Sequence, residues 1–168
     1  KDLGIDYIID LENILISPHF VPLKEAKNLR DLYSMVRMVL GKPCDPEQRR
    51  ETNFSENLKS GQGECMEKSA LFQIAMDFFR KTGNYPLSGK RSFYVSAFVK
   101  QESEQRFSNH AFNIVTSENN SLLIDLENPF LDEQYNELPY IVPAKGIDQN
   151  TGKIVIPKRF AVGRTYNL

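Results

Sequence analysis

Cys65 stands where a cysteine can act as a nucleophile. It follows Gly61-Gln62-Gly63, which interrupts regular structure, and it opens a segment whose apolar residues recur at helical spacing. In the first turn of a helix the peptide N–H groups lack partners and the helix dipole is positive, so a thiolate is stabilised there. The same N–H groups could hold the oxyanion of a tetrahedral intermediate. A free cysteine is more often simply buried in a core, so Cys65 needs partners before it indicates a site.

His110 and Asp125 are residues of the types that such a thiol requires. His110 is one of only two histidines and opens a β-branched, aromatic segment; Asp125 interrupts the apolar run 122–126, where an unpaired carboxylate would be costly. A thiol nucleophile needs a base that titrates near neutral pH, and that base needs an acceptor to orient it. We therefore predict a catalytic triad of Cys65, His110 and Asp125 that transfers an acyl group through a thioester.

The elements that must position these residues divide the chain into two halves. The first half has helical spacing and the second half is rich in strand-forming residues, so we predict an α+β fold with an antiparallel sheet rather than alternating βαβ units. Residues 5–16 fit either helix or strand. The expected helices are residues 24–40, a short polar helix that starts at Asp45-Pro46 and ends before Gly61, and a helix from Cys65 to Gly83. The expected strands are residues 92–99, 110–116 and 121–126, with weaker candidates at 153–156 and 159–162.

The register of the predicted hairpin decides whether His110 can meet Asp125. Direct pairing of these two residues requires a turn at residues 117–118, or an irregular loop with a bulge. The asparagines at 119–120 favour a turn that would carry Asp125 too far along the strand. Phe112 and Ile114 share a face with His110 in a strand, and we expect them to pack under the nucleophile helix.

Three segments resemble those that carry the triad of the transglutaminase-like superfamily, a group with a papain-like fold. Residues 63–70 (GECMEKSA) are similar to its nucleophile segment, residues 110–114 (HAFNI) to its histidine strand and residues 123–125 (LID) to its aspartate strand. The resemblance implies a helix carrying the cysteine, packed on an antiparallel sheet that carries the other two residues. It also implies action on amide bonds of a protein or peptide substrate, as a transglutaminase, deamidase or peptidase, without a cofactor.

The sequence also departs from related patterns. His110 follows Cys65 by 45 residues, much less than the separation of about 130 or more in papain proper. Met66 follows the cysteine where the family often has an aromatic residue. Gln62 is a further candidate for lining the oxyanion site, although its spacing is not that of the papain oxyanion glutamine.

Other functions remain open at this stage. Arg49-Arg50 and residues 63–67 resemble the nucleophile segment of arylamine N-acetyltransferases, which would imply acetyl transfer, but only 43 residues follow Asp125 where those enzymes have a long region. The same fold could also serve as a catalytically inactive binding module, or as a structural domain of a larger protein.

The composition is that of one globular domain spanning residues 1–168. The chain has 40% hydrophobic and 26% charged residues and a net charge of -1, without the basic excess of a nucleic-acid binder. No apolar run approaches the roughly 18 residues that span a bilayer, and the N-terminal residues do not form a signal peptide, so we expect no membrane partner. Two cysteines and two histidines without ligand spacing predict no metal site. Because the chain begins with Lys1 rather than Met, it is expected to be a processed product or one domain of a longer protein; compartment and oligomeric state are not indicated.

Overall fold

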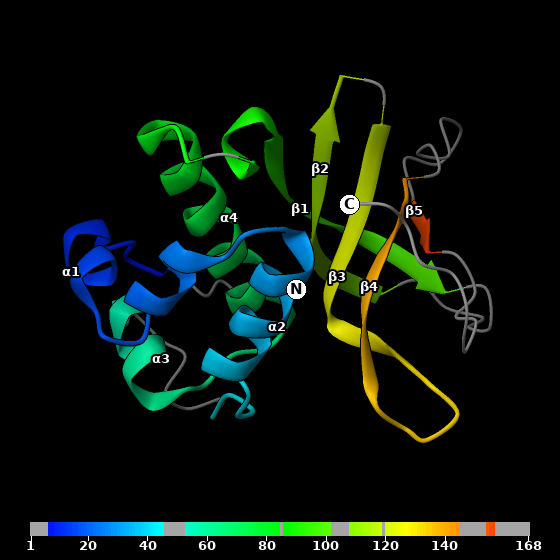
Figure 1. The fold of residues 1–168 in the computed structure, drawn as a ribbon. Coiled ribbons are helices and arrows are strands. Elements are labelled where there is room, and N and C mark those ends of the chain that lie inside the picture. The colour runs from blue at the N-terminus through cyan, green and yellow to red at the C-terminus, as the bar shows by residue number, and fades with distance from the viewer. Residues whose placement is uncertain are drawn as a thin grey trace.

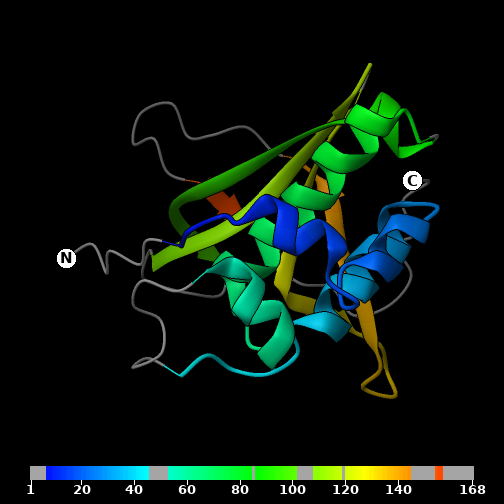
Figure 2. The same ribbon diagram turned by 90° about the vertical axis from the view of Figure 1, so that its left-hand side faces the viewer.

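The protein has an α+β fold in which helices gather on one side of a twisted sheet. The computed structural model describes residues 7–45, 53–84, 86–101, 108–118, 120–144 and 154–156. In both ribbon views α4 lies next to the sheet, on the same side as the other helices (Figure 1, Figure 2). The helices are α1 (Leu11–Ile16), α2 (Leu29–Val39), α3 (Phe54–Ser60) and α4 (Cys65–Thr82), with 3₁₀ turns η1 (Val21–Glu25) and η2 (Leu87–Gly89). The strands are β1 (Arg91–Gln101), β2 (Ser108–Ser117), β3 (Asn120–Leu131), β4 (Glu137–Pro143) and β5 (Ile154–Ile156).

The sheet confirms the predicted α+β class. Its strand order is β4-β3-β2-β1-β5, and the first four strands are antiparallel, while β5 runs parallel to β1 at one edge. Strands β1, β2 and β3 cover the three predicted ones, and β5 matches the candidate at 153–156. The candidate at 159–162 lies outside the described residues. Strand β4 was not predicted.

The helix predicted over residues 24–40 is shorter than expected. Residues Val21–Glu25 form η1 instead, and α2 begins at Leu29 because the Asn28 side chain caps it, accepting a hydrogen bond from the Asp31 N–H at 2.8 Å. The predicted start at Asp45-Pro46 falls on residues of which 46–52 are outside the described part. The short helix before Gly61 exists as α3, and Gly61 ends it in the left-handed conformation, with a φ of 73°.

Helix α4 has the bounds that the sequence indicated. Cys65 is its first residue, and the side chain of Glu67 accepts a hydrogen bond from the Glu64 N–H at 2.9 Å, half of a capping box. Gly83 closes the other end with a φ of 70°. Leu71, Phe72, Ala75 and Phe79 are buried along the helix, which packs against β1, β2 and β3. This burial fixes the position of the Cys65 end relative to the sheet.

Within the described ranges, no helix has both the length and the apolar character that crossing a bilayer demands.

Candidate active site

Cys65 occupies the first position of α4 and is partly exposed. Neither Cys44 nor Cys65 is in a disulfide, and Cys44 is buried while Cys65 is partly exposed. The first N–H groups of a helix have no carbonyl within the helix to pair with. Cys65 therefore combines an accessible thiol with the environment that the sequence predicted.

His110 and Asp125 meet in the structure, as the sequence predicted. The Nε2 atom of His110 lies 3.0 Å from Oδ2 of Asp125, and their side chains are 12% and 0% exposed. Nε2 makes no hydrogen bond that satisfies both distance and angle, so its N–H points away from the line to Oδ2 and the contact is mainly ionic. A carboxylate with no exposed surface is stable only when paired, and the imidazole supplies one partner.

The register that produces this contact differs from the one expected. Strands β2 and β3 pair Ser117 with Asn120 and Asn113 with Ile124, so the hairpin closes between Ser117 and Asn120. The ladder ends at Asn113–Ile124, and its continuation by one residue would place Asp125 opposite Phe112. The prediction of direct 110–125 pairing, with a turn at 117–118 or a bulge in the hairpin, is therefore wrong. His110 reaches Asp125 diagonally, over a distance that a long side chain can span on one face of a sheet.

Asn113 of β2 is hydrogen-bonded to α4, a contact that the sequence did not indicate. Asn113 is fully buried and its Nδ2 donates to the Ser69 carbonyl in α4 at 3.1 Å, so it is Asn113 that points toward the helix. Phe112 is also fully buried, in the same hydrophobic core as Leu71 and Phe72 of α4, and its position directly under the helix stays a prediction. Phe112 also stacks with the His110 ring, at 6.3 Å between centroids and 27° between planes.

The Asp125 carboxylate is bound by the irregular part of β3 that follows it, residues 126–128, where the register with β4 shifts and the chain makes the Asp125 turn. Oδ1 accepts hydrogen bonds from the Glu127 N–H at 3.0 Å and the Asn128 N–H at 3.2 Å. Oδ2 accepts from Nδ2 of Asn128 at 3.1 Å, on the same oxygen that faces His110. The carboxylate and the turn therefore form one hydrogen-bonded unit, which compensates the burial of the charge.

The electrostatic surroundings favour the protonated form of His110. Burial alone would lower the pKa of the imidazole, but its contacts with the Asp125 carboxylate and the Cys65 thiol outweigh burial and raise the pKa of His110 from 6.5 to about 10. Cys65 is thus the second neighbour that favours the protonated imidazole. Because Nε2 lies beside Oδ2 of Asp125, Nδ1 is the ring nitrogen that remains for the thiol.

Two further groups stand near the thiol that the sequence analysis did not single out. Tyr94 of β1 is 38% exposed; burial and then the neighbouring Cys65 and Glu67 raise its pKa. Glu67 is fully buried, two residues after Cys65, and accepts a hydrogen bond from the Tyr7 hydroxyl at 2.5 Å. In the sequence Tyr94 is simply an aromatic residue of a predicted strand. Only its position opposite α4 in the structure distinguishes it from other exposed aromatic residues.

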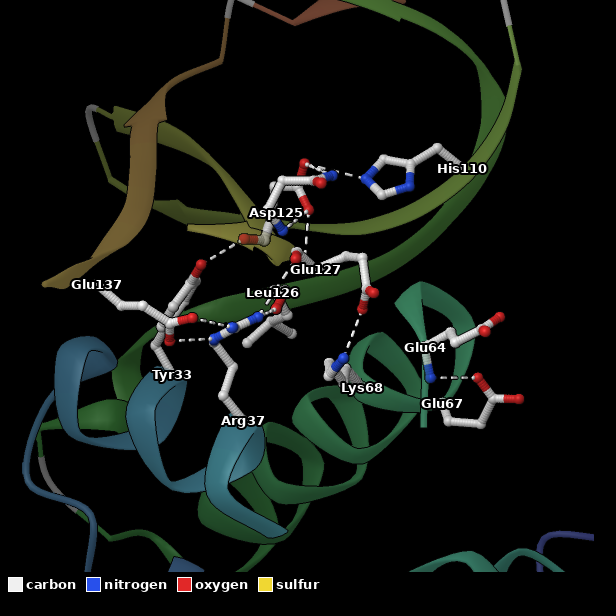
Figure 3. A network of polar contacts seen from close by, with 11 residues as sticks. Tyr33, Arg37, Glu64, Glu67, Lys68, His110, Asp125, Leu126, Glu127 and Glu137 are labelled. Carbon is white, nitrogen blue, oxygen red and sulfur yellow. Dashed lines mark hydrogen bonds and ion pairs between the residues drawn. The ribbon is translucent and has the colours of Figure 1, made fainter. Parts of the chain in front are cut away.

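Side chains of helix α2 are hydrogen-bonded to the backbone of the turn after Asp125 (Figure 3). The Tyr33 hydroxyl donates to the Asp125 carbonyl at 2.6 Å, and Nη1 of Arg37 donates to the Leu126 carbonyl at 2.6 Å. On the side of α4, Nζ of Lys68 lies 2.6 Å from Oε2 of Glu127. These contacts join segments about 60 to 100 residues apart, for which the sequence offers no local signal.

The structure does not bring Gln62 to the triad. Its backbone forms an isolated bridge with Lys42, and its carbonyl accepts a hydrogen bond from Nδ2 of Asn57 at 3.2 Å. Among the described residues no contact joins its side chain to Cys65 or His110, so its role at the oxyanion remains a prediction. In the same part of the chain, no group of three or more His, Cys, Asp or Glu residues is arranged to hold a metal ion.

In comparisons with known proteins, no family model, no curated protein and no solved structure matched this chain. The site must therefore be interpreted from its own geometry.

Proposed function

We propose that the protein is a cysteine-dependent acyl-transfer enzyme that acts on amide bonds of a protein or peptide, with a transglutaminase-like arrangement of its site. One observation carries the proposal: a thiol at a helix N-terminus, a histidine and a buried carboxylate, far apart in sequence, converge in that order. A free buried cysteine or a strand-end aspartate would need no such partners. The resemblance of residues 63–70, 110–114 and 123–125 to the transglutaminase-like segments supports the same assignment.

The raised pKa of His110 indicates how the thiol is activated. At neutral pH the imidazole holds a proton, and the neighbouring Cys65 can then hold the negative charge of a thiolate–imidazolium pair. The thiolate attacks the carbonyl carbon of the amide and forms a C–S bond, while the carbonyl π electrons move to oxygen. The resulting oxyanion is positioned to accept from the Cys65 N–H at the start of α4.

The second half of the reaction uses the same groups. The oxyanion collapses, the C–N bond breaks, and the imidazolium of His110 gives its proton to the departing amine, which leaves a thioester on Cys65. Water or a primary amine then attacks the thioester while His110 accepts its proton, and the thiolate is released. Asp125 stabilises the imidazolium throughout and fixes its orientation.

The substrate that this chemistry fits is a glutamine side chain or a peptide bond. Attack on the side-chain amide releases ammonia, and attack on the backbone releases a new N-terminus. Resolution by water gives a deamidase or peptidase, and resolution by a lysine amine gives a transglutaminase.

The proposal is tested by measuring these products separately. The purified chain is incubated with a library of glutamine-containing peptides, with and without a fluorescent primary amine, and ammonia, amine incorporation and new N-termini are quantified. The expected result is turnover that Cys65→Ala abolishes and Cys44→Ala preserves. Asp125→Ala should reduce the rate less than removal of His110 does, because the base remains.

A mechanism-based thiol probe supplies the decisive control. If an amide-mimicking electrophile fails to label Cys65, and no product depends on Cys65, the proposal is wrong and an inactive binding module becomes the better interpretation. Labelling of Cys65 together with acetyl transfer to an arylamine would instead favour the N-acetyltransferase alternative.

A further inference from the structure

The turn after Asp125 lacks the support that a regular sheet would give it. Strand β3 stops pairing with β2 at Ile124, and its register with β4 shifts between Asp125 and Phe130. The carbonyl groups of this turn therefore lack the N–H donors that a regular strand ladder would provide. A buried carbonyl without a partner is costly, so some other part of the chain must supply donors.

Helix α2 supplies these donors to three consecutive carbonyls. Tyr33 donates to the carbonyl of Asp125, and Nη1 of Arg37 donates to those of Leu126 and Glu127, at 2.6 and 3.3 Å. Tyr33 is 2% exposed, and its hydroxyl also contacts the backbone of Tyr140, the residue paired with Asp125 on β4.

The guanidinium of Arg37 is itself held in place. Nε and Nη2 donate to the two carboxylate oxygens of Glu137 at 3.2 and 2.8 Å, so the planar group is fixed on one side by β4 and on the other by the turn. Figure 3 shows this continuous path from Glu137 through Arg37 and the turn to His110. Lysine carries the same charge but cannot form such a fork.

We propose that Tyr33 and Arg37 are positioning residues, which set the Asp125 turn so that its carboxylate lies against His110. The carboxylate is bonded to the N–H groups of the same turn, so displacing the carbonyls displaces the carboxylate with them. The consequence for catalysis rests on the proposed function, but the consequence for the imidazole does not.

The experiment follows the titration of His110 by NMR of the imidazole nitrogens between pH 6 and 10.5. The chain has two histidines, so a His19→Gln variant assigns the signals. The charged or titratable groups in contact with His110 are Asp125 on β3 and Cys65 on α4, and neither is changed in these variants. Tyr33→Phe and Arg37→Met should each lower the His110 midpoint by about one unit, because the carboxylate moves away from the ring. Arg37→Lys should lower it less.

Two residues of the same helix provide matched controls. Arg30 is exposed on α2, and Val36 is buried on α2 without a bond to the turn, so Arg30→Met tests loss of charge and Val36→Ala tests loss of stability. Neither should move the titration. If Tyr33→Phe, which removes one oxygen, leaves the midpoint unchanged in a folded protein, the inference is overturned; an equal shift in Val36→Ala would overturn it as well.

The turnover of the same variants separates this inference from the proposed function. Where the wild type is active, Tyr33→Phe and Arg37→Met should reduce kcat more than they change KM, because they displace the group that stabilises the imidazolium. A shifted titration in a chain without any thiol-dependent activity would refute the proposed function and leave the positioning role intact. Activity together with an unshifted titration would refute the positioning role alone.

Discussion

The raised pKa of His110 makes the stability of the protein depend on pH in a definite direction. Between the unfolded value of 6.5 and the folded value of about 10, the folded state binds more protons at this group than the unfolded state does. The free energy of unfolding should therefore fall as the pH rises through this window. The contribution is fully present below pH 6.5 and is lost above pH 10.

The size of this effect follows from the shift and the burial of the ring. Each unit of pKa shift corresponds to about 1.4 kcal/mol, so the whole shift sets an upper limit of about 5 kcal/mol. The imidazole is only 12% exposed, so solvent screens the interaction weakly. Part of the shift comes from the contact with Cys65. In a Cys65→Ala background the Asp125 contact alone should leave about 2–3 kcal/mol.

The assay is urea unfolding at half-unit steps from pH 6 to 10.5. Cys65→Ala is compared with the double variant Cys65→Ala/His110→Gln, and the difference between their slopes isolates the histidine. Raised pKa values at Tyr7 and Tyr33 affect both proteins equally above pH 10, so they cancel. Parallel curves for the two proteins between pH 6.5 and 10 would show that the contact with Asp125 does not stabilise the imidazolium.

Three further outcomes are expected. Iodoacetamide should label Cys65 at least about tenfold faster than the buried Cys44 at neutral pH, and faster labelling of Cys44 would remove Cys65 as the nucleophile. His110→Ala should reduce turnover by about 10²–10⁴-fold, measured as product formation at saturating peptide. Gly63→Ala should destabilise the protein by about 1–3 kcal/mol in thermal unfolding and slow Cys65 labelling, because its Cβ would lie 2.8 Å from Leu40 Cβ. Gly89→Ala, where a Cβ meets nothing within 4 Å, is the control and should change neither measurement.

The elements were predictable from the sequence where local signals are strong. The bounds of α4 follow from the glycines on either side of it, because Gly83 can adopt the left-handed conformation that ends a helix. Strand β4 escaped prediction because its buried residues Tyr140, Ile141 and Val142 form a short run directly followed by Pro143, and proline normally indicates the end of a strand. Pairing with β3 stabilises this short run, and pairing is a tertiary effect that a single segment does not reveal.

The site was predictable in its residues but not in its geometry. The types and order of Cys65, His110 and Asp125 indicated their chemistry, whereas the hairpin register depends on which residues the whole sheet buries. The contribution of α2 had no signal at all: its apolar periodicity shows that Tyr33 is buried, but not that its hydroxyl meets a carbonyl 92 residues away. Side chains that act through tertiary hydrogen bonds are therefore the part of a site that sequence patterns leave out.

The irregularity of the sheet at Asp125 is what makes a buried carboxylate possible there. Had β3 continued its ladder with β2, the N–H groups of Glu127 and Asn128 could have been taken by strand partners. Because the ladder ends at Ile124 and the β4 register shifts, these N–H groups turn toward the Asp125 side chain and bind it. The carbonyls of the same turn are then left to the donors of α2. Three features thus depend on one another: the break in the sheet, the charge beside His110 and the contact with α2. A change to any of them should shift the titration of the His110 imidazole.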